Sequence, residues 1–156
     1  MNILKSFVYA AQGLWHCIST QRNFRFHIVA AISVMIVSLF YQFDRFEIMC
    51  LSFAILFVMI CEMFNTAIES TVDMRGREYN INAKIAKDVA AGAVMLAAGL
   101  SVIIAIELFW DVEKIIYVIN FFVERPYLWI VLGIYIIAAV CFVIGLPFRN
   151  KEKNNG

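Results

Sequence analysis

The chain has 156 residues, of which 63% are hydrophobic and only 16% are charged, and its mean hydropathy is +0.81. A soluble domain of this size is about half apolar and about a quarter charged. The net charge of +1 provides no field that would attract a polyanion. The composition therefore excludes a soluble enzyme, a disordered tail and a nucleic-acid-binding module, and it places the chain in a bilayer.

The four cysteines form no C-x-x-C pair, and no histidine lies at ligand spacing from them. We expect them to be small buried hydrophobic residues rather than disulfide partners or zinc ligands. The first 25 residues also lack the ordered features of a cleavable signal peptide, so none is expected.

Residues 2–20 place apolar side chains at i, i+3 and i+4 spacing, and Lys5, Gln12, His16 and Ser19 fall on the opposite side. This periodicity predicts an amphipathic helix. The segment is too polar to span a bilayer, so we place it flat on the membrane surface. A helix packed on a soluble core is the alternative, but the composition disfavours it.

Two apolar segments follow. Residues 26–43 contain His27 as their only ionisable side chain and nearly match a hydrocarbon core of about 30 Å. After a short turn at 41–45, residues 48–61 are uncharged but too few to cross. The second span must therefore continue through Glu62 toward Glu69. A carboxylate in or at the edge of the membrane indicates a functional site.

Residues 74–83 break the apolar pattern and predict a polar loop. A third helix is expected to begin near Lys84 and is uncharged from 89 to 106, with small residues that favour close helix packing. A second polar stretch at 107–125 precedes a fourth apolar run at 127–146. We divide the chain into a membrane domain at 1–110 and a C-terminal extension at 111–156.

Lysine and arginine fix the expected orientation. Ten of them fall in the N-terminal region, the 74–87 segment and the tail, and three fall on the opposite side. The positive-inside rule puts both termini in the cytoplasm if the chain has four spans. The predicted fold is an all-α polytopic membrane protein with a surface helix, three core transmembrane helices and a fourth C-terminal transmembrane helix.

Polar side chains recur along the second span at Glu62, Asn65, Glu69 and Asp73, with Thr66 beside them. At about 100° per residue they share one helical face that runs from inside the membrane to its cytoplasmic surface. Carboxylates this close repel one another, and a divalent cation relieves that repulsion. Mg²⁺ fits, because it prefers oxygen ligands and is commonly shared with substrate phosphates.

Further charged and polar residues flank the predicted loop: Arg75, Arg77, Glu78, Tyr79, Asn80, Lys84, Lys87 and Asp88. The combination suits phosphoryl transfer between a soluble nucleotide and a lipid hydroxyl. No P-loop motif is present, which excludes a conventional nucleotide-binding domain. Asp73 and the two arginines could equally be solvent-exposed side chains without a role in a site. From the pattern alone, we expect His27 to be a packed or interfacial side chain.

Two strings carry a resemblance. Glu62-Met-Phe-Asn-Thr-Ala-Ile-Glu-Ser-Thr-Val-Asp73 and Ala86-Lys-Asp-Val-Ala-Ala-Gly-Ala-Val94, together with Arg22-Asn-Phe-Arg25, resemble the bacterial integral-membrane diacylglycerol kinase and undecaprenol kinase family. The resemblance covers roughly residues 1–110 and implies a lipid kinase of the inner membrane that forms homotrimers with shared active sites. The Ala-Ala-Gly-Ala string at 90–93 is similar to the Gram-positive branch, whose lipid is undecaprenol rather than diacylglycerol.

The resemblance also implies site residues. Glu62 would be the general base toward a lipid alcohol, and Asn65 would position the reacting groups. Glu69, with Gln21, would hold Mg²⁺. The residues implied at the ATP site are Tyr9, Gln21, Glu69, Glu78, Tyr79, Asn80, Lys87 and Asp88. Those implied at the lipid site are Trp15, Asn23, Phe24, Arg25, His27 and Ala91.

Two departures from the family pattern matter. Gln21 replaces a glutamate that serves as a second metal ligand, and the run at 127–146 has no counterpart in a three-span protein. A catalytically weakened homologue with a structural or regulatory role is therefore one alternative. A small transporter that uses Glu62 as a proton relay is another, although the outer halves of the spans are almost free of polar residues.

Overall fold

The computed structural model describes residues 3–74 and 80–148. Within these ranges the chain is helical and contains no strand. The elements are α1 (Ile3–Thr20), α2 (Arg22–Tyr41), α3 (Arg45–Asp73), α4 (Ile81–Phe109), α5 (Val112–Val123), α6 (Tyr127–Val143) and the 3-10 turn η1 (Leu146–Phe148). The prediction of an all-α polytopic membrane protein is confirmed.

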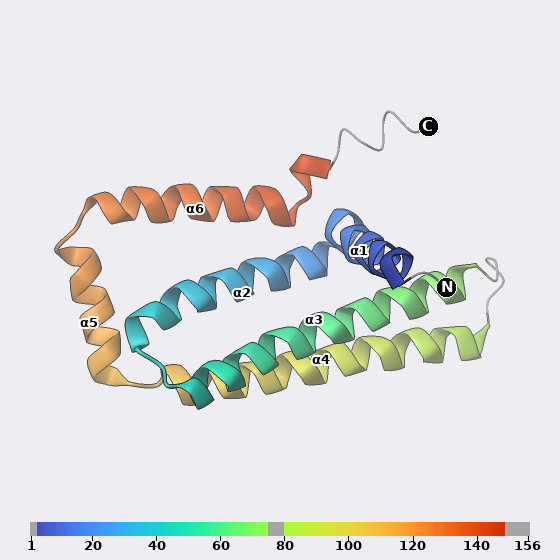
Figure 1. Cartoon of the computed structure of the whole chain (residues 1–156), viewed down its shortest axis with the longest axis horizontal. Helices are drawn as coiled ribbons and strands as arrows, with labels where there is room; N and C mark the ends of the chain where they lie inside the picture. Colours follow the sequence, from blue (N-terminus) through green and yellow to red (C-terminus); the bar gives the residue numbers. More distant parts are fainter. Residues whose placement is uncertain (1–2, 75–79, 149–156) are drawn as a thin grey trace.

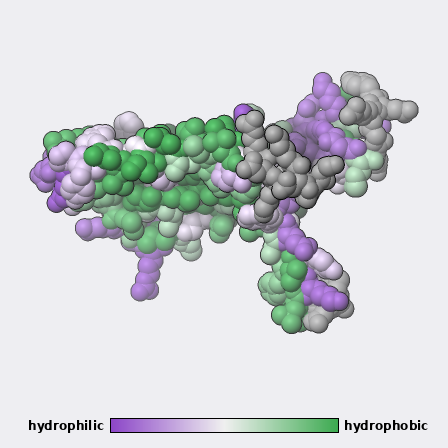
Figure 2. Space-filling view, turned by 90° about the horizontal axis from the view of Figure 1, so that it is seen from above, coloured by the Kyte–Doolittle hydropathy of each residue, from purple (hydrophilic) through white to green (hydrophobic). Residues whose placement is uncertain are grey.

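Three of the helices, α2, α3 and α4, are long and apolar enough to cross a membrane. They run side by side, while α1 lies across the start of α2 and meets α3 before that helix ends (Figure 1). Hydrophobic side chains dominate the middle of the long body, and hydrophilic ones gather toward its ends (Figure 2). This arrangement agrees with a surface helix attached to a bundle of spans.

Local capping explains where the spans begin. Asp44 and Glu47 form a capping box at the start of α3, with hydrogen bonds of 2.7 and 2.8 Å between side chain and backbone. The side chain of Asn80 accepts from the backbone N–H groups of Asn82 and Ala83. Because Asn80 caps it, α4 begins at Ile81 and not near Lys84 as predicted.

Small residues bring α3 and α4 together as an antiparallel pair. Ala54, Ala90 and Ala97 are buried, and the Ser101 hydroxyl donates to the Ala54 carbonyl oxygen at 3.1 Å. A backbone carbonyl is within reach of the facing helix only where the two axes approach closely. Of the small residues in this span, Ala90 and Ala97 lie buried, whereas Ala91, Ala93 and Gly99 are exposed.

The C-terminal extension differs from the prediction. Residues 107–125 were expected to form a polar stretch, but they contain the last turn of α4 and the helix α5, which Asp111 caps. Residues 112–123 carry apolar side chains at helical spacing, but the charged residues at and beyond both ends of this segment hide the pattern. The α5 helix leads across the end of α2, and α6 returns alongside α2 (Figure 1).

The α6 helix has 17 residues and makes an angle of 102° with α5. At a rise of about 1.5 Å per residue it is about 25 Å long, slightly shorter than the hydrocarbon core of a bilayer. The Tyr135 hydroxyl lies 2.7 Å from that of Ser33 and also donates to the Val29 carbonyl oxygen at 3.3 Å, which fixes α6 against α2. A fourth crossing by α6 remains a prediction.

Candidate active site

Glu62 is the most buried carboxylate among the described residues, with 3% of its surface exposed. Its Oε1 atom lies 3.6 Å from Nε2 of His27 on α2, and the Asn23 side chain is a hydrogen-bonding neighbour of the carboxylate. The start of α2 therefore meets α3 at this carboxylate. A buried acid that contacts two polar side chains is a candidate reactive group.

Thr66 continues the buried surface one turn further along α3. Its hydroxyl donates to the Glu62 carbonyl oxygen at 3.0 Å. On the other side it is a hydrogen-bond partner of the Cys17 thiol, which brings α1 against α3. Cys17 is buried, and burial raises the pKa of its thiol. All four cysteines are free; Cys17 is buried as predicted, whereas Cys50, Cys61 and Cys141 are partly exposed.

The predicted polar face of α3 is present beyond Thr66. Asn65 Nδ2 donates to Glu69 Oε1 at 3.1 Å, while Asn65 Oδ1 is buried and has no hydrogen-bond partner. At the end of the helix, Asp73 pairs with Lys87 of α4 across 2.6 Å. Buried polar atoms are normally satisfied, so the unpaired Asn65 oxygen marks a position where a ligand atom can bind.

The oxygen atoms of Asn65 and Glu69 are hard donors of the kind that Mg²⁺ prefers. Across residues 3–74 and 80–148, no three His, Cys, Asp or Glu side chains lie close enough to hold a metal ion. The donors present thus fit an ion that oxygen atoms of a bound ligand also coordinate. Gln21, the other predicted ligand, lies between α1 and α2 and makes no side-chain cap bond.

The remaining predicted nucleotide contacts that the structure describes lie on α1 and at the start of α4. Tyr9 is exposed on α1, and Asp88 is exposed on the first turns of α4 near Lys87. Asn80 uses its side-chain oxygen to cap α4. Glu78 and Tyr79 lie outside the described residues.

The predicted lipid contacts separate into three groups. Asn23 and His27 lie against Glu62, and Trp15 and Ala91 are exposed on α1 and α4. Phe24 is fully buried and Arg25 is 6% exposed, so both of these side chains face protein. His27 and Glu62 are 35 positions apart in the sequence and lie on different helices. Their contact cannot be predicted from helical periodicity, because periodicity relates only residues of one helix.

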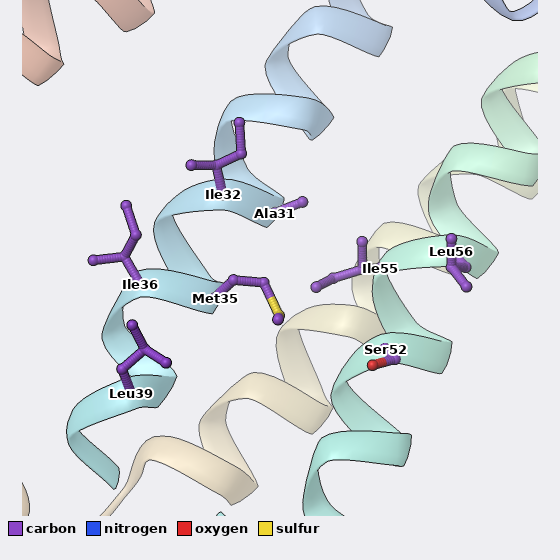
Figure 3. A pocket seen from close by; sticks show the side chains of 8 residues that line it. All are labelled: Ala31, Ile32, Met35, Ile36, Leu39, Ser52, Ile55 and Leu56. Atoms are coloured by element: carbon purple, nitrogen blue, oxygen red, sulfur yellow. The ribbon is translucent and has the colours of Figure 1, made fainter. Parts of the chain in front are cut away.

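An open apolar groove of about 560 Å³ lies between α2 and α3, on the membrane side of the polar residues. Figure 3 shows Met35 and Ile55 pointing toward one another across it, with Ala31 above and Ser52 below. A smaller cavity of about 100 Å³ begins at His27 and is lined mainly by apolar side chains of α2, α3 and α4. Apolar space thus adjoins the Glu62 and His27 pair.

The part of the chain that forms α1 to α4 is similar to known proteins. Residues 8–109 match the family model described as prokaryotic diacylglycerol kinase. The chain belongs to this family of membrane lipid kinases. It is 43% identical over 104 residues to a diacylglycerol kinase of Synechocystis, which covers 66% of this chain and 59% of that protein.

Two other relatives of this chain match it over most of their own length. An undecaprenol kinase of Bacillus subtilis is 42% identical over 108 residues, covering 69% of this chain and 88% of that protein. A diacylglycerol kinase of Escherichia coli K12 is 32% identical over 110 residues, covering 70% and 90%. The family match ends at residue 109, so α5, α6 and η1 lie outside it.

Proposed function

We propose that this lipid kinase transfers the γ-phosphate of ATP to the hydroxyl group of a membrane lipid alcohol, with undecaprenol favoured over diacylglycerol. The observation that carries the proposal is the buried Glu62 carboxylate at the junction of α2 and α3, from which polar residues lead to the end of α3. The relatives include a diacylglycerol kinase and an undecaprenol kinase. The Ala-Ala-Gly-Ala string at 90–93 favours the undecaprenol branch.

In this proposal Glu62 accepts the proton of the lipid hydroxyl. The hydroxyl oxygen then bonds to the γ-phosphorus, and the bond from that phosphorus to the β,γ-bridging oxygen breaks, so ADP leaves. His27 and Asn23 hold the Glu62 carboxylate in place from α2. Such a base contributes about 10²- to 10⁴-fold to the rate.

Asn65 and Glu69 are the residues that we propose for Mg²⁺, with Gln21 as a neutral third ligand. The ion would offset phosphate charge when bound. Lys87, held by Asp73, lies at the same end of the bundle and would attract the triphosphate. Tyr9, Asn80 and Asp88 would contact the nucleotide as well.

We place the kinase in the bacterial inner membrane, with this end of the bundle in the cytoplasm. The proposed groove between α2 and α3 would then hold the hydrocarbon part of the lipid within the bilayer, while ATP approaches from water. Homotrimers with shared sites belong to this proposal because the exposed faces of α3 and α4 leave room for further copies of the chain.

The direct test uses purified full-length protein in mixed micelles and ATP labelled at the γ-phosphate. We expect labelled lipid phosphate with Mg²⁺, more with undecaprenol than with diacylglycerol, and none after chelation by EDTA. If neither undecaprenol nor diacylglycerol acquires the label, the proposal is contradicted. A higher rate with diacylglycerol would leave the lipid kinase in place and overturn the choice of substrate.

Gln21 supports a second candidate, a weakened homologue that acts as a structural or regulatory subunit. Gln21→Glu restores a carboxylate where the family pattern has one. If the parent is a working kinase, we expect labelled product from both proteins and a lower Mg²⁺ requirement in the variant. An inactive parent whose activity Gln21→Glu does not restore would favour the regulatory role.

A further inference from the structure

We propose that the C-terminal extension positions the active site, through a clamp in which Arg25 joins the end of α6 to the corner between α1 and α2. The expected effect on lipid phosphorylation rests on the proposed function. It assigns a role to the end of α6 and to η1, which lie in the part of the chain that the family match leaves out.

The clamp is formed by hydrogen bonds from one guanidinium group. Arg25 Nη1 donates to the carbonyl oxygens of Ile18 and Ser19, each at 3.0 Å, and Arg25 Nε donates to that of Val143 at 3.1 Å. These carbonyls belong to the last turns of α1 and α6, where backbone oxygens have no partner within the helix. A cation also suits the negative end of a helix dipole, and here two such ends meet at one side chain.

Residues after α6 complete the enclosure of Arg25. The Phe148 ring lies 5.6 Å from the guanidinium carbon and 5.8 Å from the Trp15 ring of α1. Gly145 has φ +79, and a Cβ added there would lie 3.0 Å from Arg25 Nη2. This position thus requires glycine both for its backbone conformation and for the room that Arg25 occupies.

The corner that Arg25 fixes is part of the candidate site. Asn23 and His27, two residues to either side of Arg25, both approach Glu62. Cys17, at the end of α1, is buried against Thr66. If the clamp opens, α1 and the start of α2 can shift relative to Glu62. A shift of about 1 Å in a positioning group can lower activity up to about a hundredfold.

Gly145→Ala tests the clamp, because a methyl group there opposes both the backbone conformation and Arg25. Gly133→Ala is the matched control, since a Cβ at Gly133 would meet nothing within 4 Å. Both changes are made in full-length protein whose Cys50, Cys61 and Cys141 are replaced by alanine. The rate at which N-ethylmaleimide alkylates Cys17 then reports the packing of α1 on α3.

We expect Gly145→Ala to speed Cys17 alkylation about threefold or more, and to raise the KM for the lipid alcohol about fivefold. The KM for ATP should rise less than that for the lipid, because Tyr9 and Gln21 lie on the corner that shifts whereas Glu69 and Lys87 lie on α3 and α4. Simple loss of folded protein would lower kcat and leave both KM values unchanged. Gly133→Ala should match the parent in all of these measurements.

A milder pair keeps the test decisive if Gly145→Ala does not fold. Phe148→Ala removes the ring beside Arg25, whereas Leu146→Ala changes an exposed neighbour. Faster alkylation only in Phe148→Ala supports the clamp. Unchanged alkylation and unchanged lipid KM in the folded clamp variants would overturn it. Because alkylation needs no substrate, it decides the question even if the protein phosphorylates no lipid.

Discussion

Glu62 and Glu69 lie two turns apart on α3, but their surroundings suit different roles. Glu62 is buried beside His27, whereas Glu69 is partly exposed and accepts a hydrogen bond from Asn65. A buried carboxylate next to apolar space suits a lipid hydroxyl. A partly solvated carboxylate near an unpaired amide oxygen suits a hydrated cation and its phosphates.

This difference predicts that Glu69→Gln raises the KM for MgATP about tenfold, because one anionic ligand is lost. The KM for the lipid alcohol should stay within about twofold, since Glu69 does not face the groove between α2 and α3. Steady-state kinetics with each substrate varied in turn provide the measurement. An unchanged MgATP requirement would remove Glu69 from the proposed metal site.

The polar face of α3 could be predicted from the sequence because helical geometry alone places residues three, four and seven apart on one side. The contacts of Glu62 with His27 and of Thr66 with Cys17 could not, because they depend on how three helices pack. The resemblance pointed to Arg25 as a lipid contact. Its actual partners lie as far away as Val143, 118 residues later in the chain.

At the scale of helices, the capping box of Asp44 and Glu47 fixes the start of α3. We expect Asp44→Ala to destabilise the fold by about 1 kcal/mol and Asp44→Asn to cost much less, because asparagine caps equally well. The midpoint of unfolding by SDS in mixed micelles measures both. Equal midpoints for parent and Asp44→Ala would show that the cap does not limit stability.

The attachment of α6 to α2 gives a second prediction at this scale. Tyr135→Phe removes the hydroxyl that meets Ser33 and Val29, and hydrogen bonds between membrane helices average about 0.6 kcal/mol. Tyr127→Phe is the control because Tyr127 is exposed at the start of α6. We expect a lower SDS midpoint for Tyr135→Phe only. A similar loss in both variants would contradict specific docking of α6.

At the scale of the whole molecule, the bundle has one end that carries α1, the last turns of α3 and the first turns of α4, and an opposite end that carries α5 (Figure 1). The spans could be predicted from hydropathy because bilayer thickness limits their length. The turn between α5 and α6 could not, since it depends on packing against α2.

This arrangement predicts that Lys84 and Lys114 face opposite sides of the membrane. In a cysteine-free background, Lys114→Cys in intact cells should react with a membrane-impermeant maleimide, and Lys84→Cys should react only after lysis. The excess of lysine and arginine near Lys84 sets this direction. Labelling of both positions in intact cells would contradict the proposed topology.

The central claim is that Glu62 takes the proton of the lipid hydroxyl, and one pair of variants tests it most directly. Glu62→Gln and Glu107→Gln make the same chemical change at a buried and at an exposed glutamate. We expect Glu62→Gln to lower kcat for lipid phosphorylation at least about a hundredfold with ATP binding retained, and Glu107→Gln to match the parent. Turnover by Glu62→Gln near the parent rate would contradict the claim.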